Sequence, residues 1–154
     1  MKLSDYLNSE KYIILDDNAK NKKEIISHLV SLSKETGQVT DVALFEKNVM
    51  LREQISSTGL GYGVAIPHSK DKTVEDLFCV FIRNKKKIDF DAIDDERVDL
   101  FFMIGSPPAK ATGQYLELLA KVSLFANDDT RREQLRQVGT AAELLEIVRE
   151  FDKL

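Results

Sequence analysis

The chain has 154 residues, 43% of them hydrophobic and 31% charged, and a formal net charge of −4 at pH 7. This length and balance predict one globular domain over residues 1–154. The acidic charge argues against nucleic acid as a partner, because proteins that bind a phosphate backbone usually carry a basic face. No apolar run approaches the roughly 18 residues that cross a bilayer, so we expect no membrane insertion. The single cysteine rules out an intrachain disulfide, which favours the cytoplasm.

The first third of the chain predicts one strand and two helices. The apolar run at 12–15 favours a strand. Asn21 is placed to cap a helix, and Gly37 ends it. A second helix is expected to begin at Asp41 and to end near Arg52.

The middle of the chain predicts the strands of a sheet. Two continuous apolar runs, 77–82 and 99–105, are typical of strands buried on both faces, and a shorter strand is expected at 64–66. We expect residues 84–87, which include three lysines, to form an exposed turn before a short strand at 88–90.

The last third of the chain predicts helices. An apolar stripe runs from 115 to 126, Asp128 or Asp129 is placed to cap a short helix, and Thr140 opens a capping box for the last one. Together these elements predict an α/β domain with a central mixed β-sheet flanked by helices.

The most informative stretch joins the second helix to the strands and ends at His68. It contains Gly59, Gly61 and Gly63 at alternate positions, followed by a short apolar run and Pro67-His68. A preceding helix, instead of a strand, excludes a dinucleotide fingerprint, and no Gly-Lys-Ser/Thr follows as a Walker loop requires. The glycines either supply a turn with positive φ or let backbone N–H groups approach an anion.

His68 is the candidate reactive residue. Pro67 restricts the residue before it to an extended backbone, which fixes the approach of the chain. An imidazole with a pKa near 6.5 is mostly neutral in the cytoplasm, so one ring nitrogen is free to accept and return a phosphoryl group. The alternative is a surface histidine with no role. The other histidine, His28, lies beside the apolar positions of a helix and is interpreted as structural.

Arg52 and the hydroxyl residues of the loop are candidate partners of a phosphoryl group. Arg52 is either a solvated charge at a helix end or a fixed positive charge for the equatorial oxygens in phosphoryl transfer. Ser57 and Thr58 either form the turn or donate hydrogen bonds to the same oxygens. Cys79 lies in an apolar strand and is expected in the core. Two distant histidines and this cysteine make a poor zinc set, so we predict neither a metal nor a cofactor.

This segment resembles the signature of the type-2 enzyme IIA domain of the bacterial phosphoenolpyruvate-dependent phosphotransferase system, the fructose/mannitol class. The similar stretches are 52–53, 57–61 and 63–68. Residues 2–7 look like the opening helix of the family, and 116–119 look like its later helix. Residues 88–94, followed by 98–100, are similar to the stand-alone nitrogen-regulatory members.

The resemblance implies an α/β fold and a phosphorylation site. His68 would take a phosphoryl group on Nε2 from a phosphorylated histidine carrier protein, with Arg52 nearby and Ser57, Thr58 and Gly59 in a supporting loop. Sugar-transport members pass the group to a IIB domain, whereas nitrogen-type members bind target proteins according to their phosphorylation state.

One position departs from the family pattern. Many members carry a second histidine at the start of the later helix, where this chain has Tyr115. Its hydroxyl can hydrogen-bond a phosphate, or its ring can be a core residue. The sequence therefore favours a cytoplasmic phosphocarrier closer to the regulatory branch. A sugar-transport IIA component and a binding module that no longer transfers phosphate remain the alternatives.

Overall fold

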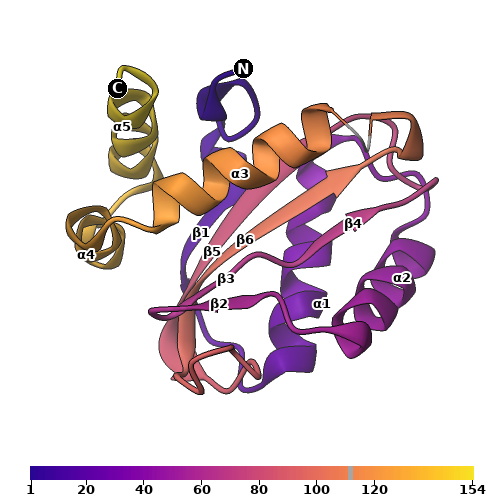
Figure 1. Cartoon of the computed structure of the whole chain (residues 1–154), viewed down its shortest axis with the longest axis horizontal. Coiled ribbons are helices and arrows are strands. Elements are labelled where there is room, and N and C mark those ends of the chain that lie inside the picture. The colour runs from indigo at the N-terminus through magenta and orange to yellow at the C-terminus, as the bar shows by residue number, and fades with distance from the viewer. Residues whose placement is uncertain (111–112) are drawn as a thin grey trace.

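The computed structural model describes residues 1–110 and 113–154, which fold around one mixed β-sheet (Figure 1). Strands follow the order β1-β5-β6-β3-β2, and β4 pairs with β6 farther along the edge that β3 occupies. Their bounds are β1 (Ile13–Asp17), β2 (Gly59–Gly61), β3 (Val64–Ala65), β4 (His68–Lys70), β5 (Phe78–Ile88) and β6 (Val98–Ser106). β1 is parallel to β5, and β3 and β4 are parallel to β6, whereas the β5–β6 and β2–β3 pairs are antiparallel. The predicted α/β domain with a mixed sheet is confirmed.

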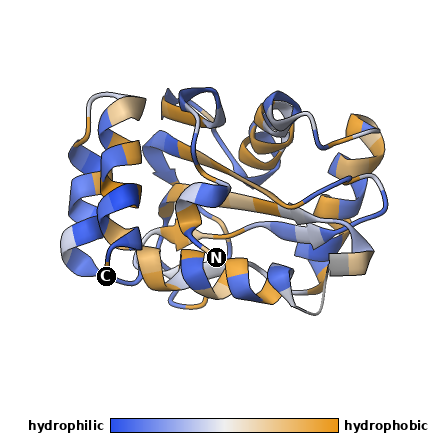
Figure 2. Ribbon diagram, turned by 90° about the horizontal axis from the view of Figure 1, so that it is seen from above, coloured by the Kyte–Doolittle hydropathy of each residue, from blue (hydrophilic) through white to orange (hydrophobic). Residues whose placement is uncertain are grey.

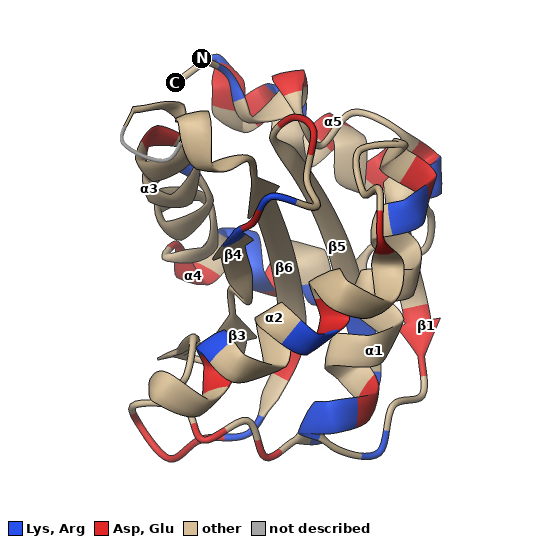
Figure 3. Ribbon diagram, turned by 90° about the vertical axis from the view of Figure 1, so that its right-hand side faces the viewer, with Lys and Arg blue, Asp and Glu red and all other residues tan. Residues whose placement is uncertain are grey.

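Helices cover both faces of this sheet (Figures 1 and 3). On one face lie α1 (Lys22–Ser33) and α2 (Val42–Ile55). The core of the other face includes side chains from α3 (Gln114–Ala126), α4 (Asp129–Gln137) and α5 (Ala141–Asp152). The structure also contains short 3₁₀ helices, which are η1 (Leu3–Asp5), η2 (Glu10–Tyr12), η3 (Lys34–Thr36) and η4 (Pro108–Lys110). Figure 2 shows hydrophilic and hydrophobic segments alternating along the helices, as expected when one side of each faces a core.

The paired strands β5 and β6 form the centre of the molecule. Phe81 lies opposite Phe102, and their rings pack with centroids 4.8 Å apart in the core that includes α3. The next pair, Val80 and Met103, faces the α1–α2 side. Because successive side chains of a strand point to opposite faces and both faces are covered, the paired segments 78–82 and 100–104 are apolar without interruption. The predicted buried strands at 77–82 and 99–105 are confirmed.

The predicted turn at 84–87 is wrong, because β5 continues through these residues to Ile88. Asn84 is buried in the strand, where its side chain accepts a hydrogen bond from Ala19 N and donates to Ala19 O and Lys86 O. Ala19 lies 65 residues away in the sequence, and its two contacts help to satisfy an amide side chain of a residue type that is common in turns. The three exposed lysines therefore lie on the projecting arm of β5, and the chain reverses only after it.

Helix starts follow the predicted caps. Asn21, Asp41, Asp128 and Thr140 each have an extended backbone, and each side chain accepts a hydrogen bond from the backbone N–H three residues later. Helix ends were less well predicted: α2 continues to Ile55 instead of ending near Arg52. The stretch that looks like the opening helix of the family forms only the single turn η1.

Candidate functional site

The backbone around His68 is held on both sides by the sheet. The residue begins β4 opposite Ile104 of β6, a strand that was not predicted beyond the one expected at 64–66. On the preceding side, Pro67 O accepts from Ile104 N at 3.0 Å, and Ile66 N donates to Thr58 O at 3.0 Å. The half-buried imidazole therefore projects from a rigid segment.

A backbone carbonyl selects the tautomer of His68. Its Nδ1 lies 2.6 Å from Ile66 O. A carbonyl oxygen only accepts hydrogen bonds, so Nδ1 must carry the proton, and Nε2 of the neutral ring is left with its lone pair. The pKa of His68 is lowered, chiefly by burial and further by the charge of Arg52, against opposing effects of Ile66 and Glu53. The ring is therefore neutral at pH 7, with Nε2 as its nucleophilic atom.

Arg52, His68 and Tyr115 line one open cavity of about 570 Å³. Arg52 comes from the last turn of α2, and its Nη1 donates to Ser56 O at 2.9 Å, which holds the guanidinium at the helix end. Lys70 and Lys72 line the same cavity. The fold therefore brings three cationic side chains to the cavity that His68 faces, an arrangement that suits an anion.

Tyr115 is a core residue that also lines the His68 cavity, and a hydrogen bond from its hydroxyl to a phosphate stays a prediction. It lies in the first turn of α3, and its ring centroid is 6.0 Å from that of His68. The residue is only 6% exposed and packs in the core with Leu118 and Val122. Burial raises the pKa of its hydroxyl, an effect that the charge of Arg52 opposes. The ring is thus a core element whose side chain also lines the His68 cavity.

The supporting residues Ser57, Thr58 and Gly59 do not line that cavity. The Ser57 hydroxyl donates to Phe90 O at 2.8 Å and accepts from Gly59 N at 3.1 Å. A Cβ atom on Gly59 would lie 2.7 Å from the Cα atom of Ala92, so only glycine fits there. These residues attach the loop to segment 90–92, and a direct phosphate role for them stays a prediction that their contacts do not favour.

Glu53 is the important residue to which the sequence assigned no role. Its carboxylate is almost fully buried and accepts from Thr58 N at 2.6 Å and from the Thr58 hydroxyl at 2.5 Å. Because Thr58 O in turn pairs with Ile66 N, Glu53 supports the residue whose carbonyl orients His68. Its position directly after Arg52, in the stretch that carries the resemblance, was the available signal.

The glycines serve the turn that the sequence offered as one alternative. Gly61, Tyr62 and Gly63 all have positive φ, at 107°, 57° and 79°. Tyr62 N donates to Asp94 and Tyr62 O accepts from Arg136, so both backbone groups at the tip are engaged. Gly61 and Gly63 therefore supply the positive φ angles that the hairpin between β2 and β3 needs.

The other candidate residues have structural surroundings. His28 Nδ1 lies 2.7 Å from Asp17 Oδ2, in a pair that joins α1 to β1. Cys79 is fully buried in β5, and burial raises the pKa of its thiol to about 12. Within residues 1–110 and 113–154, no cluster of three or more His, Cys, Asp or Glu side chains is arranged to hold a metal ion. In the same residues, no helix has the length and apolarity needed to cross a membrane.

Residues 6–151 match the family model described as "Phosphoenolpyruvate-dependent sugar phosphotransferase system, EIIA 2". The chain belongs to this family. It is therefore a type-2 IIA domain, a phosphotransfer component of that system.

Relatives of this IIA domain divide between two named roles. A "Nitrogen regulatory protein" of Klebsiella oxytoca is 35% identical over 153 residues, which cover 97% of this chain and 91% of the relative. The "PTS system fructose-specific EIIABC component" of Bacillus subtilis (strain 168) is 29% identical over 99% of this chain, which spans only 24% of that longer protein. Among solved structures, the nitrogen regulatory protein IIA-Ntr from Neisseria meningitidis aligns with a TM-score of 0.84 at 34% identity, covering 91% of this chain and 94% of that one.

Proposed function

We propose that this IIA domain accepts a phosphoryl group on Nε2 of His68 from a phosphorylated histidine carrier protein. The observation that carries the proposal is the 2.6 Å contact between His68 Nδ1 and Ile66 O. It leaves the lone pair of Nε2 available on a neutral ring. Family membership supports the reaction class, since the family is a phosphotransfer family.

The reaction needs no group beyond the two imidazoles and the fixed charges. The lone pair of Nε2 attacks phosphorus, the donor N–P bond breaks, and its electron pair returns to the donor nitrogen. Negative charge on the equatorial oxygens is stabilised by Arg52, with Lys70 and Lys72 adding to the local potential. The positive charge left on the His68 ring is stabilised by Ile66 O, which accepts the Nδ1 proton. Onward transfer reverses these steps toward the next acceptor.

We further propose that the protein acts mainly as a regulator in the cytoplasm, binding target proteins according to its phosphorylation state. Support comes from nitrogen regulatory relatives of nearly the same length as this chain. The alternative is a sugar-transport component that passes the group to a IIB domain, and the fructose-specific relative favours it. A module that only binds proteins through the His68 cavity is the third possibility, and it predicts no phosphorylation.

The test is incubation with phosphoenolpyruvate, enzyme I and the histidine carrier protein, followed by intact mass. We expect an acid-labile, base-stable phosphoryl adduct that is lost in His68→Ala. The matched control is His28→Ala, which removes the other histidine of the chain and should leave the adduct in place. An adduct that persists in His68→Ala would place the site elsewhere, and its absence from the wild type would favour the binding module. Adding a IIB domain then separates regulator from transporter, because only a transport component should lose the group rapidly to it.

Arg52 is tested by its effect on transfer rate. Arg52→Ala should slow phosphorylation by roughly 10²-fold or more, because fixed charge on the developing phosphoryl oxygens is lost. Arg52→Lys should recover only part of the rate, since an ammonium lacks the planar fork of donors. Wild-type rates in Arg52→Ala, measured by quenched-flow sampling and intact mass, would contradict this role.

A further inference from the structure

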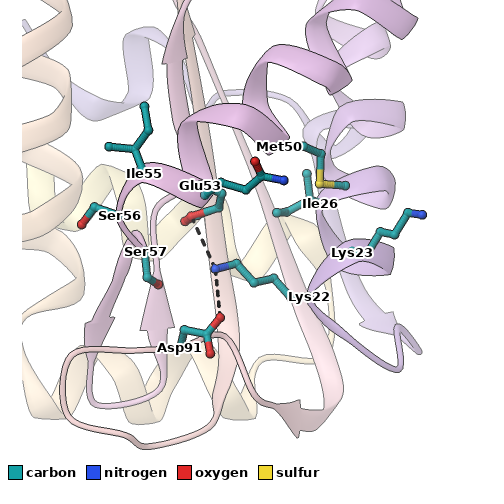
Figure 4. Close-up of a pocket in the computed structure, with 10 residues that line it drawn as sticks. Lys22, Lys23, Ile26, Met50, Glu53, Ile55, Ser56, Ser57 and Asp91 are labelled. Atoms are coloured by element: carbon teal, nitrogen blue, oxygen red, sulfur yellow. Dashed lines mark hydrogen bonds and ion pairs between the residues drawn. The ribbon is translucent and has the colours of Figure 1, made fainter.

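A second and larger cavity, of about 780 Å³, lies between the start of α1 and the end of α2 (Figure 4). It is separated from the His68 cavity by the last turn of α2 and the residues that follow. Glu53 lines the new cavity, Arg52 lines the His68 cavity, and Ile55 lines both. Its volume falls within the range of about 300–1,000 Å³ that is usual for small-molecule sites.

The lining presents charges of both signs around one ammonium group. Lys22 Nζ lies 3.9 Å from Glu53 Oε2 and 3.5 Å from Asp91 Oδ2, as the dashed lines in Figure 4 show. It also lies 3.5 Å from Phe90 O and 4.6 Å from the centroid of the Phe90 ring. A charge-assisted hydrogen bond is normally about 2.7–2.9 Å long, so this ammonium is held loosely by every partner. A ligand can therefore form shorter bonds with it than the protein does.

Two further side chains extend the polar part of the lining. Lys23 is exposed and, within the described chain, forms no ion pair. Asp91 is exposed on the loop after β5, and its backbone has a positive φ of 54°. The ammonium of Lys23 points away from that of Lys22 (Figure 4), so one ammonium group, of Lys22, lies between the two carboxylates of Glu53 and Asp91.

The remaining lining is apolar. Ile26 from α1 is 1% exposed, Met50 from α2 is half-buried, and Ile55 at the end of α2 is 83% exposed. An aliphatic ligand group can be buried against these three side chains. Met50 is the most adaptable of them, because its side chain is unbranched and flexible.

We propose that this cavity binds a small zwitterion with an aliphatic part, of the class of a free α-amino acid. Its carboxylate meets the ammonium group of Lys22, its ammonium meets Asp91, and its side chain lies against Ile26 and Met50. The charges of the lining select this class. A simple anion would face the two carboxylates, and a simple cation would face the ammonium of Lys22. A purely apolar molecule would desolvate the ion pairs of Lys22 without replacing them.

Binding is coupled to the His68 cavity through residues common to both walls. Ser56 lines the new cavity, and its carbonyl accepts the hydrogen bond from Arg52 Nη1. A ligand that shifts Ser56 therefore changes the position of the guanidinium at the His68 cavity. An effect on phosphoryl transfer rests on the function proposed above, but the movement of Arg52 does not.

The experiment is an NMR titration of the unphosphorylated protein with each standard L-amino acid in turn at millimolar concentration. We expect at least one to give saturable shifts of the backbone signals of Lys22, Lys23 and Ser57, together with the side-chain Nε–Hε signal of Arg52. For that ligand, the amine without a carboxylate and the acid without an amino group should each bind at least about tenfold more weakly, since each loses one charged contact.

Matched variants test the two charges. Lys22→Gln and Asp91→Asn should each weaken binding about tenfold, and asparagine tolerates the positive φ at position 91. The controls are Lys34→Gln, at the far end of α1, and Asp95→Asn, which also has a positive φ in the same loop but does not line the cavity. No saturable shift with any amino acid overturns the site, and equal binding of the amine or the acid overturns the ligand class. Binding without movement of the Arg52 signal overturns the coupling. None of these outcomes depends on whether His68 is phosphorylated.

Discussion

The hydrogen bonds between Thr58 and Glu53 give a direct test of what the hydroxyl residues of the loop do. Thr58 donates hydrogen bonds from both its backbone N–H and its hydroxyl to the carboxylate of Glu53, a residue that is only 6% exposed. Thr58→Val removes the hydroxyl, keeps the shape of the side chain and leaves the backbone bond in place. A hydrogen bond to a charged group contributes about 1.5–3 kcal/mol. We therefore expect Thr58→Val to lower the free energy of unfolding by about 2 kcal/mol.

Equilibrium unfolding in urea measures this loss. With a slope of about 2 kcal/mol/M, the midpoint should fall by about 1 M without a change of slope. The control Thr58→Ser keeps the hydroxyl and loses one buried methyl group, so its cost should stay below about 1 kcal/mol. The final phosphorylated fraction of folded Thr58→Val should equal that of the wild type, because the hydroxyl contacts Glu53 and not the His68 cavity. Unchanged stability combined with a smaller phosphorylated fraction in Thr58→Val would refute this reasoning and make Thr58 a phosphate ligand.

Three other predictions address the site and its hairpin. Tyr115→Phe should slow phosphorylation or shorten the lifetime of phosphohistidine, while the free energy of unfolding changes by less than about 1.5 kcal/mol; unchanged kinetics would leave the hydroxyl without a role. His68 should titrate below its usual pKa of 6.5 by NMR, mainly through burial, and Arg52→Gln should raise that pKa by removing a positive charge. Between pH 6.5 and the lowered pKa, the unfolded chain binds a proton at His68 that the folded chain does not. The contribution of His68 to stability is therefore present above pH 6.5 and is lost as the pH falls through the lowered pKa. A titration midpoint of His68 at or above pH 6.5 would contradict this. Gly63→Ala should lower the free energy of unfolding in urea by at least about 1 kcal/mol more than Gly37→Ala does. Both glycines have a positive φ, but only at Gly63 would the new methyl group meet neighbours, Arg136 and Asp99. Equal losses in the two variants would show that these neighbours move aside.

The sequence by itself determined the elements whose causes are local. Cap residues such as Asn21 and Thr140 bond to a backbone N–H three positions away, so both partners lie within one readable stretch. The two central strands were predictable because burial on both faces requires apolar residues without interruption. His68 and Arg52 were identified as site residues from a continuous segment of the chain, and the fold places both at one cavity.

Only the tertiary structure decided the features that depend on contacts between distant segments. The extension of β5 rests on contacts between Asn84 and Ala19, and the place of Tyr115 beside His68 depends on how α3 crosses the sheet. One local feature was also hidden: the imidazole is oriented by the carbonyl of Ile66, two residues before it, and every residue type carries such a carbonyl, so no sequence pattern marks it. The pairing of Glu53 with Lys22 depends on the packing of α1 against α2. Sequence patterns record local bonding and burial, whereas the pairing of remote groups follows from how the helices and strands pack in three dimensions.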